Sequence, residues 1–159
     1  MSSPQNKPVG DRRSRSAVVV AADAAIARLF LAKNDAEWTE LDDLTNPAAH
    51  ADERELVADA AGRRGASTTQ SGNSAYGGGS MKAHRIEEFA AEVCKRVAIS
   101  LRETQAEQVH LIAEPHFLGL LRQRLDAEIR KRVGAEVSKS LARHSPEQIR
   151  AALPDDAIH

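Results

Sequence analysis

Three acidic residues are spaced so that folding could bring them together at one metal-dependent site. Asp23 follows a continuous apolar run, Glu114 follows a second apolar segment, and Glu88 lies on the predicted helix between them. Nucleases that use two Mg²⁺ ions need several converging carboxylates of this kind, and Glu92 and Asp126 are further candidates. Acidic residues are common in a chain with 28% charged residues, however, and an Asp after a strand also shapes turns. Metal-dependent cleavage of nucleic acid is therefore one hypothesis, beside a structural role for each carboxylate.

A second candidate site joins a glycine-rich stretch to a cluster of cations. Residues 62–80 contain six glycines and end directly before a predicted helix. Free N–H groups and the helix dipole at such a junction favour anions, and basic residues in the next turn favour an RNA phosphate backbone. The stretch lacks the lysine of a P-loop, and a flexible linker before a solvated helix start is the alternative. The candidate anion-binding residues are Gly77, Gly78, Gly79, Ser80, Lys82, His84 and Arg85.

The remaining histidines and the single cysteine favour structural roles. His110 lies in a predicted strand, and His116 lies in the first turn of a predicted helix. Cys94 lies inside a helix among apolar residues, where we expect a small hydrophobic side chain and not a nucleophile. His84 and Glu88 are four residues apart on one helix face and could share a metal, but two ligands are too few for a site. We therefore expect neither a resident metal nor a cofactor.

Composition narrows the classes of protein to consider. The chain has 159 residues, 22 basic and 23 acidic residues, and a net charge of −1, so no global charge draws it to nucleic acid or to a membrane. One cysteine excludes an internal disulfide. No apolar run approaches the roughly 18 residues of a membrane span, and the N-terminus has no signal-peptide pattern. We expect a cytoplasmic protein without a membrane partner.

The apolar patterns predict an α/β domain with the order β-β-β-loop-α-β-α-β-α. Continuous or alternating apolar runs predict the strands, and apolar residues at helical spacing predict the helices. A helix that begins at Pro115 is expected to continue until Gly134 stops it as a C-terminal cap. The predicted strands are residues 17–22, 26–32, 38–44, 109–112 and 135–141, and the predicted helices are residues 81–104, 115–133 and 146–153.

The order of these elements predicts the topology of the sheet. Three strands joined by short turns form an antiparallel meander, and a right-handed crossover through the long helix places the fourth strand parallel to the first. The predicted sheet order is 3-2-1-4-5, which is a ribonuclease-H-like arrangement. We expect a tail at residues 1–16, one domain at residues 17–153 with a long glycine-rich loop at 62–80, and a C-terminal tail at residues 154–159.

Several motifs of this chain resemble the bacterial host attachment protein family. The most specific is AEPHFLGLLR at residues 113–122, and the similarity extends over about residues 17–153. That family is similar in turn to the middle domain of archaeo-eukaryotic peptide-chain release factors, in which a loop ending in Gly-Gly-Gln precedes a long helix. Here Gly77-Gly78-Gly79 occupies the corresponding place, and Ser80 or Met81 stands where the glutamine is expected.

The resemblance implies a binding module and not an enzyme. Without the glutamine, peptide release is not expected, and a non-catalytic role in contacting the ribosome or RNA follows by analogy. Two other functions stay open. One is the metal-dependent nuclease that uses Asp23, Glu88 and Glu114. The other is a protein-interaction adaptor that self-associates through the edge strand near residues 135–141, because unpaired strand edges invite partners.

Overall fold

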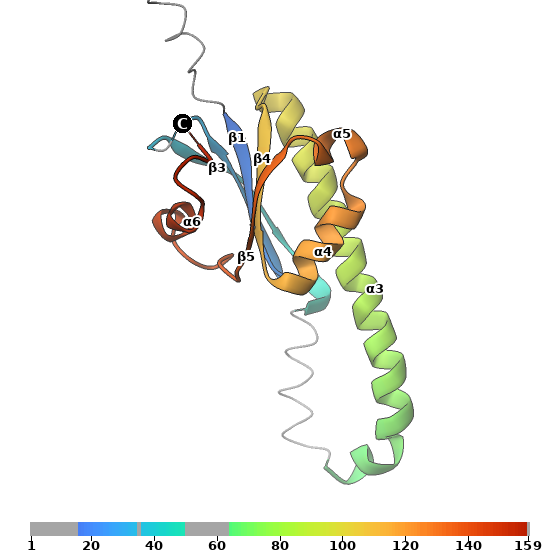
Figure 1. The fold of residues 1–159 in the computed structure, drawn as a ribbon. Coiled ribbons are helices and arrows are strands. Elements are labelled where there is room, and N and C mark those ends of the chain that lie inside the picture. Colours follow the sequence, from blue (N-terminus) through green and yellow to red (C-terminus); the bar gives the residue numbers. More distant parts are fainter. Residues whose placement is uncertain (1–15, 35, 50–63, 159) are drawn as a thin grey trace, which may run out of the picture.

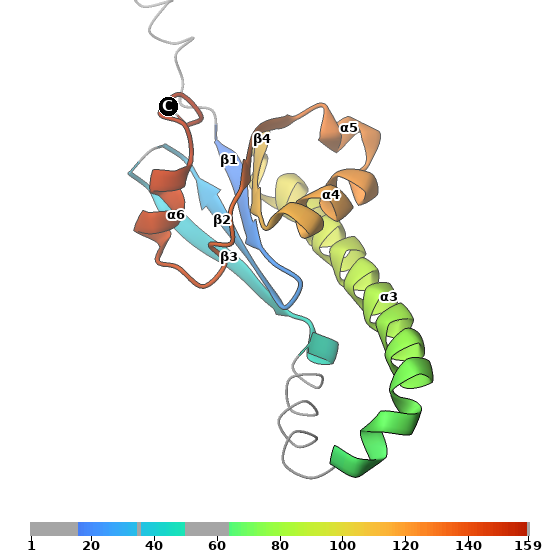
Figure 2. The same ribbon diagram turned by 60° about the horizontal axis from the view of Figure 1, so that its bottom comes forward.

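The computed structural model describes residues 16–34, 36–49 and 64–158, and for residues 64–80 it defines only the course of the helix. Five strands form one mixed sheet, with helices on both faces (Figure 1). The views of Figure 1 and Figure 2 both place α3, α4 and α5 on one side and α6 on the other. The elements are β1 Ala17–Ala22, β2 Ile26–Ala32, β3 Trp38–Thr45, α3 Arg64–Thr104, β4 Gln108–Ala113, α4 Pro115–Arg124, α5 Ala127–Arg130, β5 Val133–Ser138 and α6 Pro146–Ala152.

The sheet has the predicted order, β3-β2-β1-β4-β5. β1 pairs antiparallel with β2 and parallel with β4, with Ala17 opposite Gln108 and Ala22 opposite Ala113. β1 is central because all six of its side chains are apolar and buried, as a strand covered on both faces requires. The predicted crossover through the long helix is therefore confirmed.

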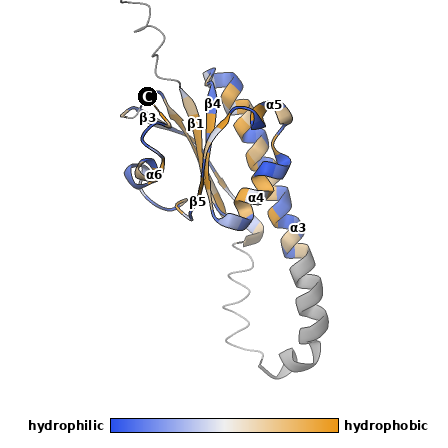
Figure 3. Ribbon diagram, in the orientation of Figure 1, coloured by the Kyte–Doolittle hydropathy of each residue, from blue (hydrophilic) through white to orange (hydrophobic). Residues whose placement is uncertain are grey.

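The two faces of the sheet support separate cores. On one face, α3 and α4 cover Val18, Val20 and Leu111, and the rings of Phe89 and Phe117 lie 5.8 Å apart. Figure 3 shows this apolar centre in orange, with polar residues on the outer sides of the helices. On the other face, the second core consists of Val19, Ala21, Phe30, Ala32, Ile112, Ile149, Leu153 and Ile158.

The long helix begins earlier than the sequence predicts. α3 starts at Arg64 and not at Met81, so the part of the expected 62–80 loop that is described is helical. The segment needs no nucleation of its own, because it continues a helix that the packing of its later turns already holds, although its glycines are poor helix formers. Gly77, Gly78 and Gly79 therefore lie inside a helix and not in a loop before one.

The predicted single helix after Pro115 is also wrong. α4 ends at Arg124, the backbone of Leu125 is extended with ψ of 138°, and α5 is a separate short helix. Leu125 and Ile129 are both buried, so each anchors its own segment despite the helical spacing. Gly134 is not a helix cap but a residue of β5, which is the edge strand predicted at residues 135–141.

The ends of the chain bear on the predicted domain boundaries. Residues 1–15 of the expected N-terminal tail lie outside the described residues. The expected C-terminal tail contributes Ile158, only 4% exposed, to the second core. Removal of this large apolar side chain from water gives a favourable free energy of burial. Within the described ranges, no helix is long and apolar enough to cross a bilayer.

Candidate functional site

The carboxyl ends of β1 and β4 meet at one edge of the sheet, where Asp23 and Glu114 follow the two strands. Ligands of parallel sheets tend to gather at this edge. α3 passes the same edge, and its residue Glu88 shares a groove with Asn46, which follows β3. The topology therefore places all three predicted carboxylates near the carboxyl ends of β1 and β4.

Asp23 shapes the turn between β1 and β2. Its Oδ1 accepts hydrogen bonds from the N–H groups of Ala25 at 2.8 Å and Ile26 at 2.9 Å. Its Oδ2 lies 3.2 Å from Nη1 of Arg143, and the Asp23 side chain is 14% exposed. Both oxygens are therefore engaged in holding the turn and the segment before α6.

Glu114 caps the helix that follows it. Its Oε1 accepts a hydrogen bond from the N–H of Phe117 at 2.7 Å, and its Oε2 accepts one from His116 at 3.2 Å. The carboxylate thus occupies the positive end of α4, where negative charge is favourable. An external anion would have to displace it.

The three carboxylates are not assembled as a metal site. Glu88 is largely exposed and forms an ion pair with His84 at 3.3 Å. Among residues 16–34, 36–49 and 64–158, no group of three His, Cys, Asp or Glu side chains is arranged to hold a metal ion. The geometry thus gives Asp23 and Glu114 local structural roles.

A groove of about 470 Å³ lies between α3 and the turn that follows β3. Phe89, only 3% exposed, is part of the first core. Asn46 fixes the turn, since its Nδ2 donates to the carbonyl of Ala24 at 3.1 Å and its Oδ1 accepts from the N–H of Ala48 at 3.1 Å. The lining residues are Asn46, Pro47, Ala48, Arg85, Glu88, Phe89 and Glu92.

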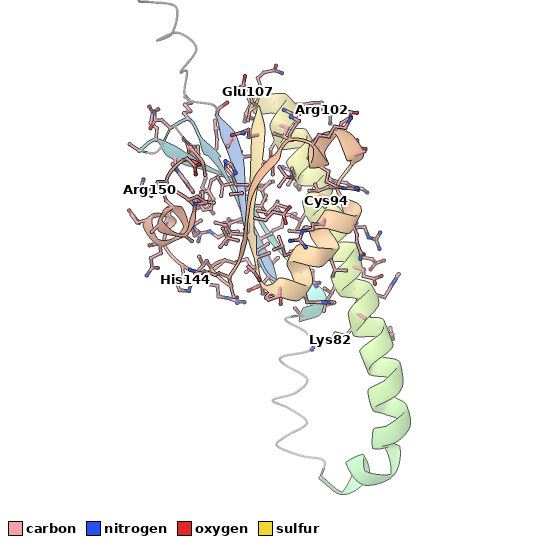
Figure 4. The ribbon with its side chains drawn as sticks, in the orientation of Figure 1. Lys82, Cys94, Arg102, Glu107, His144 and Arg150 are labelled. Carbon is pink, nitrogen blue, oxygen red and sulfur yellow. The ribbon has the colours of Figure 1, made fainter. Side chains whose placement is uncertain are left out.

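One of the predicted cations belongs to this groove. Lys82 and Arg85 are exposed, and Arg85 lines the groove. Figure 4 shows Lys82 part-way along α3, away from Arg102, which lies in the last turn of this helix. The glycines before them are helical, and the N–H groups in the interior of a helix donate to carbonyls four residues back. The cradle of free N–H groups expected for a loop is therefore not formed, and the cations remain as the candidate contact.

Arg28 organises a polar cluster that sequence reasoning missed. From β2, its Nε lies 3.0 Å from Glu40, and its Nη1 donates to the carbonyls of Ala142 at 3.1 Å and His144 at 2.7 Å. The hydrogen bond from Arg28 lowers the pKa of Glu40 below its usual value. The only local signal was an arginine in an otherwise apolar strand. Glu40 is 12 residues away in the chain, and the two carbonyls are 114 and 116 residues away.

His110 is a second residue whose role sequence reasoning missed. It is 1% exposed, and its Nδ1 accepts a hydrogen bond from the N–H of Ala135 at 2.9 Å. Its Nε2 lies 3.1 Å from the carbonyl oxygen of Ala157. A lone histidine in a strand carries no sequence signal for these two distant partners.

Comparisons with known proteins place the chain in a family. No curated protein sequence matches it. Among solved structures, it is similar to an archaeal translation termination factor, aRF1, with a TM-score of 0.47 and 12% sequence identity. That comparison covers 86% of this chain and 37% of the termination factor, so the chain spans about a third of that protein's length. The family model described as "Protein required for attachment to host cells" matches residues 18–153, and the chain therefore belongs to this host attachment family.

Proposed function

We propose that this host attachment domain is a non-catalytic module that binds RNA, with the ribosome as the assembly in which that RNA is met. The observation that supports this proposal most directly is the pair of exposed cations on α3, Lys82 and Arg85. Arg85 lines the groove near the carboxyl ends of β1 and β4. The family description names attachment to host cells and no chemical reaction. RNA binding is a molecular activity that is compatible with that role.

The charges around α3 favour phosphate in the middle of this helix, at Lys82 and Arg85. Neither Lys82 nor Arg85 takes part in any ion pair found among the described residues, whereas Arg96 and Arg124 on the packed elements pair with Asp42 and Glu87. Unpaired exposed cations can neutralise phosphates and release counterions, and this gives affinity without sequence preference. His84 next to them pairs with Glu88, so the main contribution comes from the lysine and the arginine.

The test compares two double variants of the same helix. Lys82→Ala/Arg85→Ala removes the proposed contact, and Lys95→Ala/Arg102→Ala removes two other exposed cations of α3 as a matched control. We expect ribosome co-sedimentation and RNA binding by fluorescence anisotropy to weaken only for the first variant. The slope of log affinity against log salt should fall by about 0.7 for each lost contact to single-stranded RNA. Absence of salt-dependent binding, or equal behaviour of both variants, would refute the proposal.

The free edge of β5 supports a second candidate function, self-association as an adaptor. β5 is at the end of the sheet, and its one charged residue, Glu136, is engaged by Arg122 at 2.5 Å. The opposite edge strand, β3, carries Glu40, Asp42 and Asp43. Since charges on an edge strand discourage pairing with another chain, β5 is the less protected edge.

Sedimentation analysis tests this second candidate. A lysine placed on the proposed edge by Ser138→Lys should lower the fraction of dimer, whereas Thr39→Lys on β3 should leave it unchanged. Both positions are exposed strand residues, so neither substitution buries a charge. A strictly monomeric parent protein across the micromolar range would rule self-association out.

A further inference from the structure

His110 joins three segments that are far apart in the sequence. Its ring extends from β4, contacts β5 at Ala135, and contacts the C-terminal segment, residues 154–158, at Ala157. The parallel ladder between β4 and β5 shifts register between Val109 and Leu111, where the ring of His110 takes a backbone N–H as its partner. The hydrogen bond between the His110 ring and the N–H of Ala135 thus replaces a backbone–backbone bond between the two strands.

The hydrogen bonds define the protonation state of this ring. A backbone N–H can only donate, so Nδ1, which accepts from Ala135, carries no proton. The proton of the neutral ring is then on Nε2, which donates it to the carbonyl of Ala157. An added proton on Nδ1 would point at the N–H of Ala135, and two donors cannot share that position.

The surroundings of His110 leave no space for the charged ring to turn aside. A Cβ placed on Gly134 would lie 2.6 Å from Cε1 of the ring, so the ring packs directly on the backbone of β5. Next to Ala157, Ile158 is buried in the second core. If the protonated ring stayed in place, its Nε2–H would still donate to Ala157, but its Nδ1–H would face the N–H of Ala135. To relieve this repulsion the ring must turn toward water, which also breaks the bond to Ala157 and separates both segments from β4.

Among the residues that the structure describes, no carboxylate acts on His110 to offset this effect. Val19, the neighbour of His110 on β1, is apolar. Arg132, beside β5, donates to the carbonyls of Ala106 and Glu107, and Glu136 pairs with Arg122. The other charged groups on the packed segments are exposed or half-buried residues of α6 and of the C-terminal segment, namely Glu147, Arg150, Asp155 and Asp156.

We propose that His110 is an acid-sensitive latch that holds β5 and the C-terminal segment against β4, and that its protonation releases both. Burial lowers the pKa of His110 below its usual 6.5, and the bond to Ala157 opposes this only in part. The folded state therefore prefers the neutral ring, so the latch is fully stable above about pH 6.5 and weakens as the pH falls below it. Release would uncover Ile158 and take apart the pocket of about 260 Å³ that the C-terminal segment lines together with α6.

Hydrogen exchange of the whole protein tests the latch. We expect protection factors of residues 133–138 and 153–158, each referred to an unfolded peptide at the same pH, to fall between pH 7.5 and pH 5.5. Below about pH 6.5 the fall approaches tenfold per pH unit, because opening then takes up one proton. Protection in α3 after Met81 should stay constant, and unchanged protection of both segments would overturn the proposal.

A neutral substitution separates the latch from other titrating groups. In His110→Gln, one amide supplies an acceptor for Ala135 and a donor for Ala157 without a titratable proton, so the pH response of both segments should disappear. His116→Gln, at an exposed histidine, should keep it. A response that persists in His110→Gln contradicts the latch. In the parent protein, NMR titration of the His110 ring gives an independent answer, since protonation without loss of protection also overturns it.

Discussion

The substitution Gly134→Ala tests whether the contact between β5 and His110 is as close as the structure has it. An added Cβ would lie 2.6 Å from Cε1 and 3.0 Å from Nδ1 of the His110 ring. The ring cannot easily move away, because hydrogen bonds to Ala135 and Ala157 fix its two nitrogens. Either the ring or β5 must shift, and the shift weakens at least one of these hydrogen bonds.

The expected magnitude follows from opposing contributions. Overpacking in a core costs about 1–3 kcal/mol, and a weakened hydrogen bond adds about 1 kcal/mol. Replacing glycine in a strand returns roughly 0.5–1 kcal/mol of chain entropy, and since no described glycine has a positive φ, alanine brings no backbone strain at this position. We therefore expect Gly134→Ala to lower the free energy of unfolding by about 1–3 kcal/mol.

A matched control is the other glycine with a described environment. Gly119 lies inside α4, and a Cβ there meets no atom within 4 Å. Gly119→Ala should raise the free energy of unfolding by about 0.5–1 kcal/mol, because alanine is the better helix former. The same chemical change is thus predicted to lower the free energy of unfolding at residue 134 and to raise it at residue 119.

Urea denaturation, followed by Trp38 fluorescence and by circular dichroism, measures both variants. In a His110→Ala background the effect of Gly134→Ala should shrink or reverse, which gives a coupling energy above about 1 kcal/mol in a double-mutant cycle. Equal stability of Gly134→Ala and Gly119→Ala, or a cycle without coupling between residues 110 and 134, would refute the close contact between β5 and the His110 ring.

Three further predictions follow from the packing of single groups. The Cys94 thiol, whose pKa burial raises to about 12, should resist alkylation at pH 8 in the folded protein and react promptly in denaturant, as mass spectrometry can show. Arg28→Ala should lower the free energy of unfolding by about 1–2 kcal/mol, because it leaves Glu40 and two carbonyls without their donor and water can reach the exposed ones. A double-mutant cycle with Glu40→Gln isolates the contribution of the ion pair. Replacing all of Gly77–Gly79 with alanine should slow amide hydrogen exchange in this part of α3, since each glycine in a helix costs about 1 kcal/mol relative to alanine.

The sequence predicts the strands and the topology well because their signals are local and redundant. β1 is apolar on both faces, so only a central place in the sheet suits it. Ser145 and Pro146 begin α6 with a capping box, as the residue types at these positions favour. With a meander before the long helix and one strand after it, the rule for right-handed crossovers leaves few alternatives to the observed order.

The candidate sites depend on the tertiary structure to a greater degree. Acidic residues after two parallel strands suggested a shared metal, yet Asp23 is bound to its own turn and to Arg143, and Glu114 caps its own helix. Spacing alone does not distinguish a converging carboxylate from one that satisfies nearby N–H groups. That difference is decided by backbone geometry over two or three residues, which the residue types leave open.

The sequence by itself determined which segments are buried, in which order they pair, and to which family the chain is similar. Only the tertiary structure decided what Gly134 and His110 do. The spacing of Leu125 and Ile129 favoured one helix up to Gly134, but the strand instead begins before this glycine. The physical reason is that the His110 ring occupies the space where a side chain of residue 134 would lie, and a contact between residues 24 positions apart leaves no periodic trace in either segment.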